Sequence, residues 1–391
     1  MSISWQKVRG GFTLVELLVV ISIIGVLAAL LLPSLAAARA SANASASISN
    51  MSGFGRGFTI YASQNDGKMC SAAFDHNRDG DIRQVGWVAD LIDLKVSVPG
   101  QALDAGSRNK ISEKVGDYMG ATKNSAKEVD DSTPGPWPAG TGVTHTGETY
   151  FGGDQKAKEV WQNGYNTNYA TTWHFSRGDP TAVDGYASNK KLPVDGDGPL
   201  TENHLAQGLT SAARVALMGP ARAGDGLDAL VGPGNTANSP ATGYGAVAQI
   251  MNDFAGQQIV KVNDLLVESF NDGMNVPFED TTLGGAVGKK VHEFGDIEPL
   301  HQPKDNTGGG GYAPVLFADG HVEKIADTVA YNGTSTGALY DGFIGNGVAR
   351  DTNGKITAVA IDGPSYQEIT DKIWIKRLRN RQSAAGSVNE E

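Results

Sequence analysis

The stretch GGFTLVELLVV, residues 10–20, opens a long apolar run near the start of the chain. The 21 residues from Phe12 to Leu32 would form a helix of roughly 30 Å, the thickness of the hydrocarbon core of a bilayer. No charged residue lies between Leu17 and Ala38. The sequence therefore predicts one membrane-spanning helix, with a carboxylate, Glu16, at a depth where a charge is costly.

The composition limits what the rest of the chain can be. Of its 391 residues, 40% are hydrophobic and 51 are glycine, which indicates a sizeable core joined by many turns. The net charge is −11, and no basic stripe precedes the C-terminal end, so we expect no nucleic-acid partner. Cys70 is the only cysteine, which excludes an internal disulfide and a metal site built from cysteines alone.

Three interpretations of the apolar segment stay open on these grounds. The basic leader, with Lys7 and Arg9, is expected to remain cytoplasmic while the bulk of the chain is exported. The segment can be a secretory signal peptide cut near AAA at residues 36–38, although it is long for such a signal. It can be an uncleaved anchor, which explains its length but not Glu16. The third interpretation comes from a resemblance.

The motif GFTLVE, residues 11–16, stands between the basic leader and the apolar run. In this setting it resembles the class III signal of type IV pilins and type II secretion pseudopilins. The resemblance implies that a prepilin peptidase cuts between Gly11 and Phe12 and methylates the new amino group of Phe12. It also implies an inner-membrane precursor, which a pilus or secretion machinery assembles into a homo-oligomeric periplasmic or extracellular filament. Pro33 fits this pattern, because a proline inside a helix bends its axis.

Cleavage gives Glu16 a candidate partner. A carboxylate inside a membrane needs a counter-charge, and the amino group of Phe12 in a neighbouring subunit can supply it. Since both charges are otherwise buried and unpaired, their pairing favours one stagger between neighbouring helices. We therefore expect Gly11 and Phe12 to define the processing site, and Phe12, Glu16 and Pro33 to serve assembly.

The helix is predicted to continue beyond the membrane. Alanine and serine dominate to about residue 49 and favour helix. Phe54, Phe58 and Tyr61 recur at helical spacing and are expected to face a globular core. The turn sequence QNDG, residues 64–67, then ends the helix. The sequence GFGRGF, residues 53–58, only superficially resembles a dinucleotide-binding loop, and its glycines instead predict local melting or close contact within the helix.

The remainder is predicted to be a head of short strands and small helices between Gly- and Asp-rich loops. Strand-like or helical runs occupy residues 85–94 and 209–218, a short helix is expected at 263–270, and an amphipathic helix is expected at 366–381. The fold class is therefore α+β, a long N-terminal helix on an antiparallel β-sheet head. We expect a cleaved leader at 1–11, a transmembrane and stem helix at 12–66, a head at 67–381 and a disordered tail at 382–391.

One loop of the head suggests a cation site. Oxygen-bearing side chains alternate and a glycine stands at the sixth position, as in the first half of a calcium loop; the candidate ligands are Asp75, Asn77, Asp79 and Asp81. The twelfth position is Gly86 rather than an acid, so a solvated acidic turn is the alternative. The sequence DGDG, residues 195–198, is a poorer candidate. Calcium is the one cofactor that the sequence suggests.

A second landmark is VLFADGHV, residues 315–322, which predicts a strand, an Asp-Gly turn and a strand. It resembles the C-terminal His-x9-Asp-Gly signature of prepilin-type proteins, with Asp319, Gly320 and His321 in the turn. The upstream histidine would be His301, but 17 residues separate it from Asp319. This departure favours a structural turn over a shared His301–Asp319 site.

The sequence favours a structural role over catalysis. It contains no HExxH motif. The favoured function is a filament subunit, processed by prepilin peptidase and polymerised through its N-terminal helix. The alternative is a membrane-tethered extracytoplasmic binding protein, such as a carbohydrate or surface binder, that uses a prepilin-type signal. A membrane-tethered enzyme is the third possibility.

Overall fold

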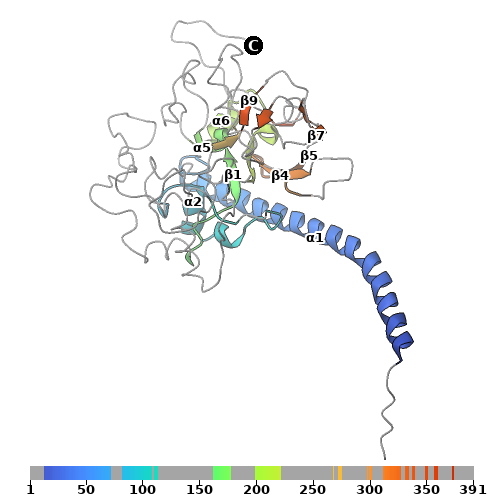
Figure 1. The fold of residues 1–391 in the computed structure, drawn as a ribbon. Helices are drawn as coiled ribbons and strands as arrows, with labels where there is room; N and C mark the ends of the chain where they lie inside the picture. Colours follow the sequence, from blue (N-terminus) through green and yellow to red (C-terminus); the bar gives the residue numbers. More distant parts are fainter. Residues whose placement is uncertain are drawn as a thin grey trace, which may run out of the picture.

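The computed structural model of the chain (Figure 1) consists of one long helix whose C-terminal half is built into a small α+β head. The α+β class predicted from the sequence is confirmed. The residues described are 13–71, 82–107, 110–112, 162–177, 199–221, 267, 272–274, 297, 299–301, 311–326, 331–333, 337–339, 348–350, 356–359 and 372–373.

Helix α1 (Leu14–Gln64) is a single helix of 51 residues, roughly 75 Å long at ~1.5 Å per residue. It bends in the half that extends away from the head (Figure 1). Pro33 lies inside the helix and is a sufficient cause of a bend, because it cannot donate a hydrogen bond to the carbonyl four residues earlier. The helix ends at the predicted turn, where the Gly67 N–H donates to the Ala62 carbonyl.

The head-packed half of α1 buries one face. The buried residues repeat every three or four positions, which is the spacing of a single helical stripe; they are Ala44, Ser47, Met51, Phe54, Gly55, Gly57, Phe58 and Ala62. Phe54 lies edge-on to Tyr169, with ring centroids 5.5 Å apart. Phe58 lies against Phe175 with centroids 4.6 Å apart, and both phenylalanines contact Trp87. Phe54 and Phe58 thus anchor the core, as their spacing predicts.

Two glycines of α1 let neighbouring elements approach the helix backbone. A Cβ at Gly57 would lie 2.2 Å from Leu91 Cδ2, and one at Gly55 would lie 3.0 Å from Leu316 Cδ1. In contrast, a Cβ at Gly53 would have only the end of the Arg56 side chain nearby, at 3.8 Å. The prediction of close contact therefore holds at positions 55 and 57, and the helix does not melt there.

Alanine scanning of these glycines has opposite expected outcomes. Gly57→Ala should destabilise the head by about 1–3 kcal/mol, because the new methyl group overlaps Leu91 in a packed core. Gly53→Ala should be neutral or stabilising by up to about 1 kcal/mol, because alanine favours helix and meets open space. Thermal unfolding of the full chain in detergent measures both. Equal midpoints for the two variants would contradict this packing.

The sheet that receives α1 has the strand order β3-β1-β2-β4-β5. Strands β1 (Tyr169–Thr172), β2 (Ala216–Pro220), β4 (Tyr312–Phe317) and β5 (Val322–Ala326) are antiparallel to their neighbours. The edge strand β3 (Asp272–Met274) instead runs parallel to β1, which the purely antiparallel prediction did not include. Strand β4 packs against α1, so the helix and the centre of the sheet form one core.

The remaining elements are short. They are α2 (Trp87–Asp93), η1 (Pro99–Gln101), α5 (Trp173–Arg177), α6 (Glu202–Ala206) and η4 (Ala212–Arg214), and the ribbons β6 (Tyr331–Gly333) with β7 (Gly337–Leu339) and β8 (Val348–Arg350) with β9 (Ile356–Val359). The run at 85–94 thus contains helix α2, and the run at 209–218 contains η4 and the start of β2. The predicted helices at 263–270 and 366–381 lie largely outside the described residues.

A carboxyl group is buried where α2 meets the end of α1. The side chain of Asp90 accepts a hydrogen bond of 2.7 Å from the Ser71 N–H. Burial raises the pKa of the Asp90 carboxyl to about 7, and the nearby charge of Asp93 acts in the same direction, while hydrogen bonds from Ser71 and Tyr61 lower it. The folded chain therefore keeps a proton that the unfolded chain has already released at the same pH.

This proton gives the head a specific pH dependence. Since the folded pKa, about 7, lies above the unfolded value, the free energy of unfolding should fall as the pH rises from about 4 to 7. We expect the thermal midpoint of the full chain in detergent to be about 5 °C lower at pH 8 than at pH 5. Asp90→Asn should remove most of this difference, and Asp93→Asn, at an exposed position, should retain most of it, because burial rather than the Asp93 charge is the main cause of the raised pKa. An unchanged pH dependence in Asp90→Asn would refute the assignment.

Candidate processing and anchoring sites

The start of α1 is closed by a capping box formed by Thr13 and Glu16. The Glu16 N–H donates to Thr13 Oγ1 at 3.2 Å. In return, the N–H and the hydroxyl of Thr13 each donate to Glu16 Oε2 at 2.8 Å. Glu16 thus satisfies free backbone groups at the helix start. The carboxylate lies beside the chain position where cleavage after Gly11 would create a new amino group.

The N-terminal half of α1 is apolar and lies outside the head. Its large hydrophobic side chains are exposed, from Leu14, which is 78% exposed, to Leu35, which is 52% exposed. Within the described part of the chain, α1 is the helix long and apolar enough to cross a membrane. This surface fits the predicted membrane span, because a bilayer, unlike water, solvates it.

At the other end of the exposed segment, a buried polar cluster joins α1 to the head. Its centre is Asp104, which follows η1. One carboxylate oxygen, Oδ2, accepts hydrogen bonds from Ser47 Oγ of α1 at 2.7 Å and from His301 Nε2 at 2.8 Å. The other, Oδ1, accepts from the N–H groups of Gly106 and Ser107. The side chains of His301 and Asp104 are 1% and 0% exposed, so this is a fully buried connection.

The surroundings of Asp104 favour its charged form. Burial raises the pKa of the carboxyl, but the hydrogen bond and charge of His301, with the bonds from Ser47 and Gly106, outweigh burial and hold the pKa below its usual value. Lys110 Nζ donates to the Asp104 carbonyl at 2.8 Å. Asn168 brackets the same backbone, accepting from the Asp104 N–H and donating to its carbonyl. A carboxylate with this many donors is held in one position.

Strand β4 places His301 in this cluster. The backbones of His301 and Tyr312 exchange two hydrogen bonds, of 3.1 and 2.8 Å, in an isolated antiparallel bridge at the start of β4. The side chain of His301 is thus paired with Asp104 and not with Asp319, a pairing that the sequence spacing already disfavoured. Asp319 instead accepts from the His321 side chain and from its N–H.

The Asp-Gly turn is present as predicted. It connects β4 and β5, with Gly320 at φ +89, a conformation that glycine adopts without strain. Asp319 and His321 are exposed by 38% and 39%, and His321 stacks on Phe317 with ring planes 3° apart. The favoured reading of a structural turn agrees with this geometry.

Several predicted site residues lie outside the described residues. They are the processing residues Gly11 and Phe12 and the four candidate calcium ligands, Asp75, Asn77, Asp79 and Asp81. Among the residues that are described, no group of three or more acidic, histidine or cysteine side chains is placed to hold a metal ion. Calcium binding therefore stays a prediction from the sequence.

The comparison with known families bears on the start of the chain. Residues 6–32 match the family described as the prokaryotic N-terminal methylation motif. The chain carries the type IV pilin and pseudopilin signal. This methylation motif ends within the apolar half of α1 and includes the capping box. A search of curated proteins and a search of solved structures each found no match to the chain.

Two features of these sites were not identified from the sequence. The capping box could have been, because T-x-x-E before an apolar run is a known signature of helix starts. The Ser47–Asp104–His301 cluster could not, since its members are 57 and 197 positions apart and nothing in their local sequence links them. Only the pairing of His301 with β4 brings them together.

Proposed function

We propose that this chain is the precursor of a structural subunit of a type IV pilus-like or pseudopilus filament. One observation carries the proposal. The methylation motif leads directly into a helix that is apolar and exposed in its first half and built into the head in its second. The motif supports cleavage by a prepilin peptidase, and the apolar helix fits an inner-membrane precursor.

The exposed half of α1 has a second use in this proposal. Outside the membrane it cannot remain in water as a single helix, since it exposes most of its leucine, isoleucine and valine side chains. Packing against the same segment of other subunits buries this surface. The rigid connection through Asp104 then fixes each head relative to its own stem, so that regular stems give regularly placed heads.

Electron microscopy of surface material tests this function. The filaments or short pseudopili sheared from cells, or isolated after overexpression, should be labelled by an antibody against the head. Cells with Gly11→Glu, in which the small residue before the cut is lost, should produce the precursor in the membrane and no labelled filament. If wild-type cells give no labelled filaments and the head is found only on membranes, the result would favour the membrane-tethered binding protein.

A further inference from the structure

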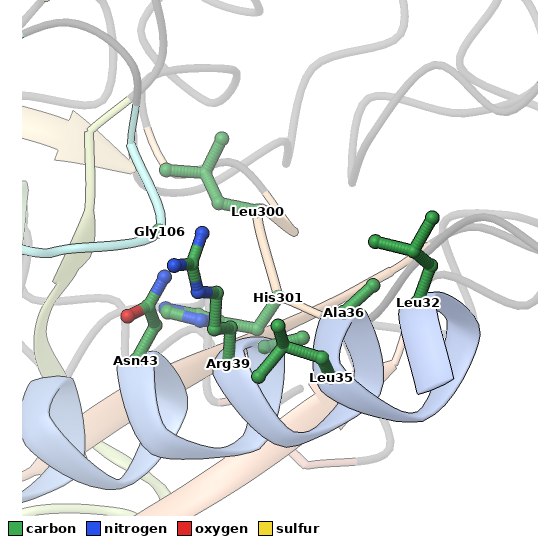
Figure 2. A pocket seen from close by; sticks show the side chains of 9 residues that line it. Leu32, Leu35, Ala36, Arg39, Asn43, Gly106, Leu300 and His301 are labelled. Atoms are coloured by element: carbon green, nitrogen blue, oxygen red, sulfur yellow. The ribbon is translucent and has the colours of Figure 1, made fainter. Parts of the chain in front are cut away.

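A pocket lies where α1 leaves the head. Its volume is about 510 Å³, and one wall is a single stripe of α1 at spacings of three and four residues; the stripe consists of Leu32, Leu35, Ala36, Arg39, Ala40 and Asn43. The opposite wall is formed by Gly106, Leu300 and His301 of the head. Figure 2 shows Arg39 and Asn43 projecting from the helix on the side of Gly106 and Leu300.

The pocket changes character along the helix. Toward the membrane segment its lining is apolar, with Leu32 and Leu35, and toward the head it becomes polar, with Arg39, Asn43 and His301 (Figure 2). Asn43 is held by a hydrogen bond of its side-chain nitrogen to the Ala105 carbonyl. The His301 ring is fixed by Asp104. The ligand that matches such a lining has an apolar part and a polar part in the same order.

The charge of the pocket indicates the chemical nature of the ligand's polar part. Arg39 is the first charged residue after Glu16, and no described side chain forms an ion pair or hydrogen bond with it. None of the described residues that line the pocket carries a carboxylate, and the nearby carboxylate of Asp104 is hydrogen-bonded to the His301 ring. The described lining of the pocket is therefore cationic, although the whole chain is acidic, and it favours an anion.

The depth of the pocket identifies the source of that anion. Leu14 to Leu35 spans roughly 32 Å at ~1.5 Å per residue, which equals the hydrocarbon core of a bilayer. Arg39 lies about one helical turn farther on, at the level of the lipid phosphates, where long basic side chains bind headgroups. The leucines lie at the level of the upper acyl chain. While the chain resides in a membrane, lipid is thus the amphiphile that always faces this pocket.

We propose that the pocket binds one anionic phospholipid of the leaflet from which the head emerges, with its phosphate on Arg39 and its upper acyl chain against Leu35 and Leu300. Bound lipid would hold the head close to the membrane surface and shield the groove between stem and head. The proposal requires the membrane span but does not depend on filament assembly, so it can fail or hold independently of the proposed function.

Native mass spectrometry of the full chain in mild detergent tests the site. The probes are dioctanoyl phosphatidylglycerol, the zwitterionic dioctanoyl phosphatidylcholine, and inorganic phosphate. We expect the phosphatidylglycerol to bind one-to-one and about 10-fold more tightly than the phosphatidylcholine, since the quaternary ammonium of choline offsets the charge of its own phosphate and is repelled by Arg39. Inorganic phosphate should bind more weakly than either lipid, because it lacks the acyl part.

Matched variants locate the binding. Arg39→Gln should abolish the preference for the anionic lipid. Arg56→Gln should keep it, because Arg56 is an exposed residue in the half of α1 that packs on the head, away from the pocket. Leu35→Ala should weaken both lipids about 3-fold or more, since it removes apolar contact, and Leu27→Ala, outside the pocket, should not. Both arginine variants should unfold at the wild-type temperature, because both side chains are exposed.

Three outcomes would overturn the proposal. The first is equal affinity for the two lipids, or an unchanged preference in Arg39→Gln. The second is inorganic phosphate binding as tightly as the anionic lipid, which would make the site a simple anion site. The third is an Arg39-dependent dimer that excludes lipid, which would assign the pocket to a second copy of the chain.

Discussion

Glu16→Gln is expected to leave the precursor cleaved and to abolish filaments. Glutamine keeps the shape of the side chain and can still complete the capping box with Thr13, but it carries no charge. In a filament, the amino group of Phe12 in the neighbouring subunit would then be buried without a partner, at a cost of about 3 kcal/mol or more per contact. That is a factor of about 100 or more in the affinity of each subunit for the filament end.

Thr13→Val is the matched control for this prediction. It keeps the charge of Glu16 and the β-branched shape at position 13 but removes the hydroxyl that both donates to and accepts from Glu16. The expected loss is that of a helix cap, about 1 kcal/mol, and filaments should persist. Immunoblots of cleaved and uncleaved chain, with counts of sheared filaments, give the readout. If Glu16→Gln still forms filaments, or if only Thr13→Val loses them, Glu16 serves to cap the helix and does not pair with Phe12.

Asp104→Ala is expected to produce the largest loss of stability of any single change in the head. It leaves the hydroxyl of Ser47, the ring of His301 and the N–H of Gly106 buried without their acceptor. Removing one partner of a buried pair in this way costs about 3–5 kcal/mol. In thermal unfolding of the full chain in detergent, the midpoint should fall by about 10 °C or more.

Two further substitutions separate this cluster from the Asp-Gly turn. Ser47→Ala removes the hydrogen bond to Asp104 and a longer one with the Tyr169 hydroxyl, and it should cost about 1–2 kcal/mol. Asp319→Asn alters an exposed pair with His321 and should stay within about 0.5 kcal/mol of wild type. A loss in Asp319→Asn as large as in Asp104→Ala would mean that His301 depends on Asp319, which the spacing of 17 residues argues against.

Local patterns predicted the long helix and the hairpin well. The uninterrupted apolar run, the small residues after Pro33 and the stop at residues 64–67 specify one helix, because each is a property of neighbouring residues. The burial of Phe54 and Phe58 and the turn at Gly320 follow in the same way. The parallel pairing of β3 does not, since a parallel neighbour is chosen by tertiary packing and not by the strand's own sequence.

The Ser47–Asp104–His301 cluster and the pocket could not be predicted from the sequence. Asp104 lies in a segment with no motif, and its role depends on Ser47 from the helix and His301 from a distant segment. The resemblance of His301 to a signature histidine concerns Asp319 alone and gives no indication of Asp104. The pocket beside Arg39 exists only because α1 and the segment at 300–301 lie side by side (Figure 2).

The most direct test of the central claim is mass spectrometry of the mature N-terminus, on chain isolated from cells. The proposed processing predicts that the first peptide begins at Phe12 and carries one methyl group on its amino nitrogen. A chain that begins at Met1, or near Arg39 after a cut at the alanines of residues 36–38, would contradict the claim that this protein is a processed filament subunit.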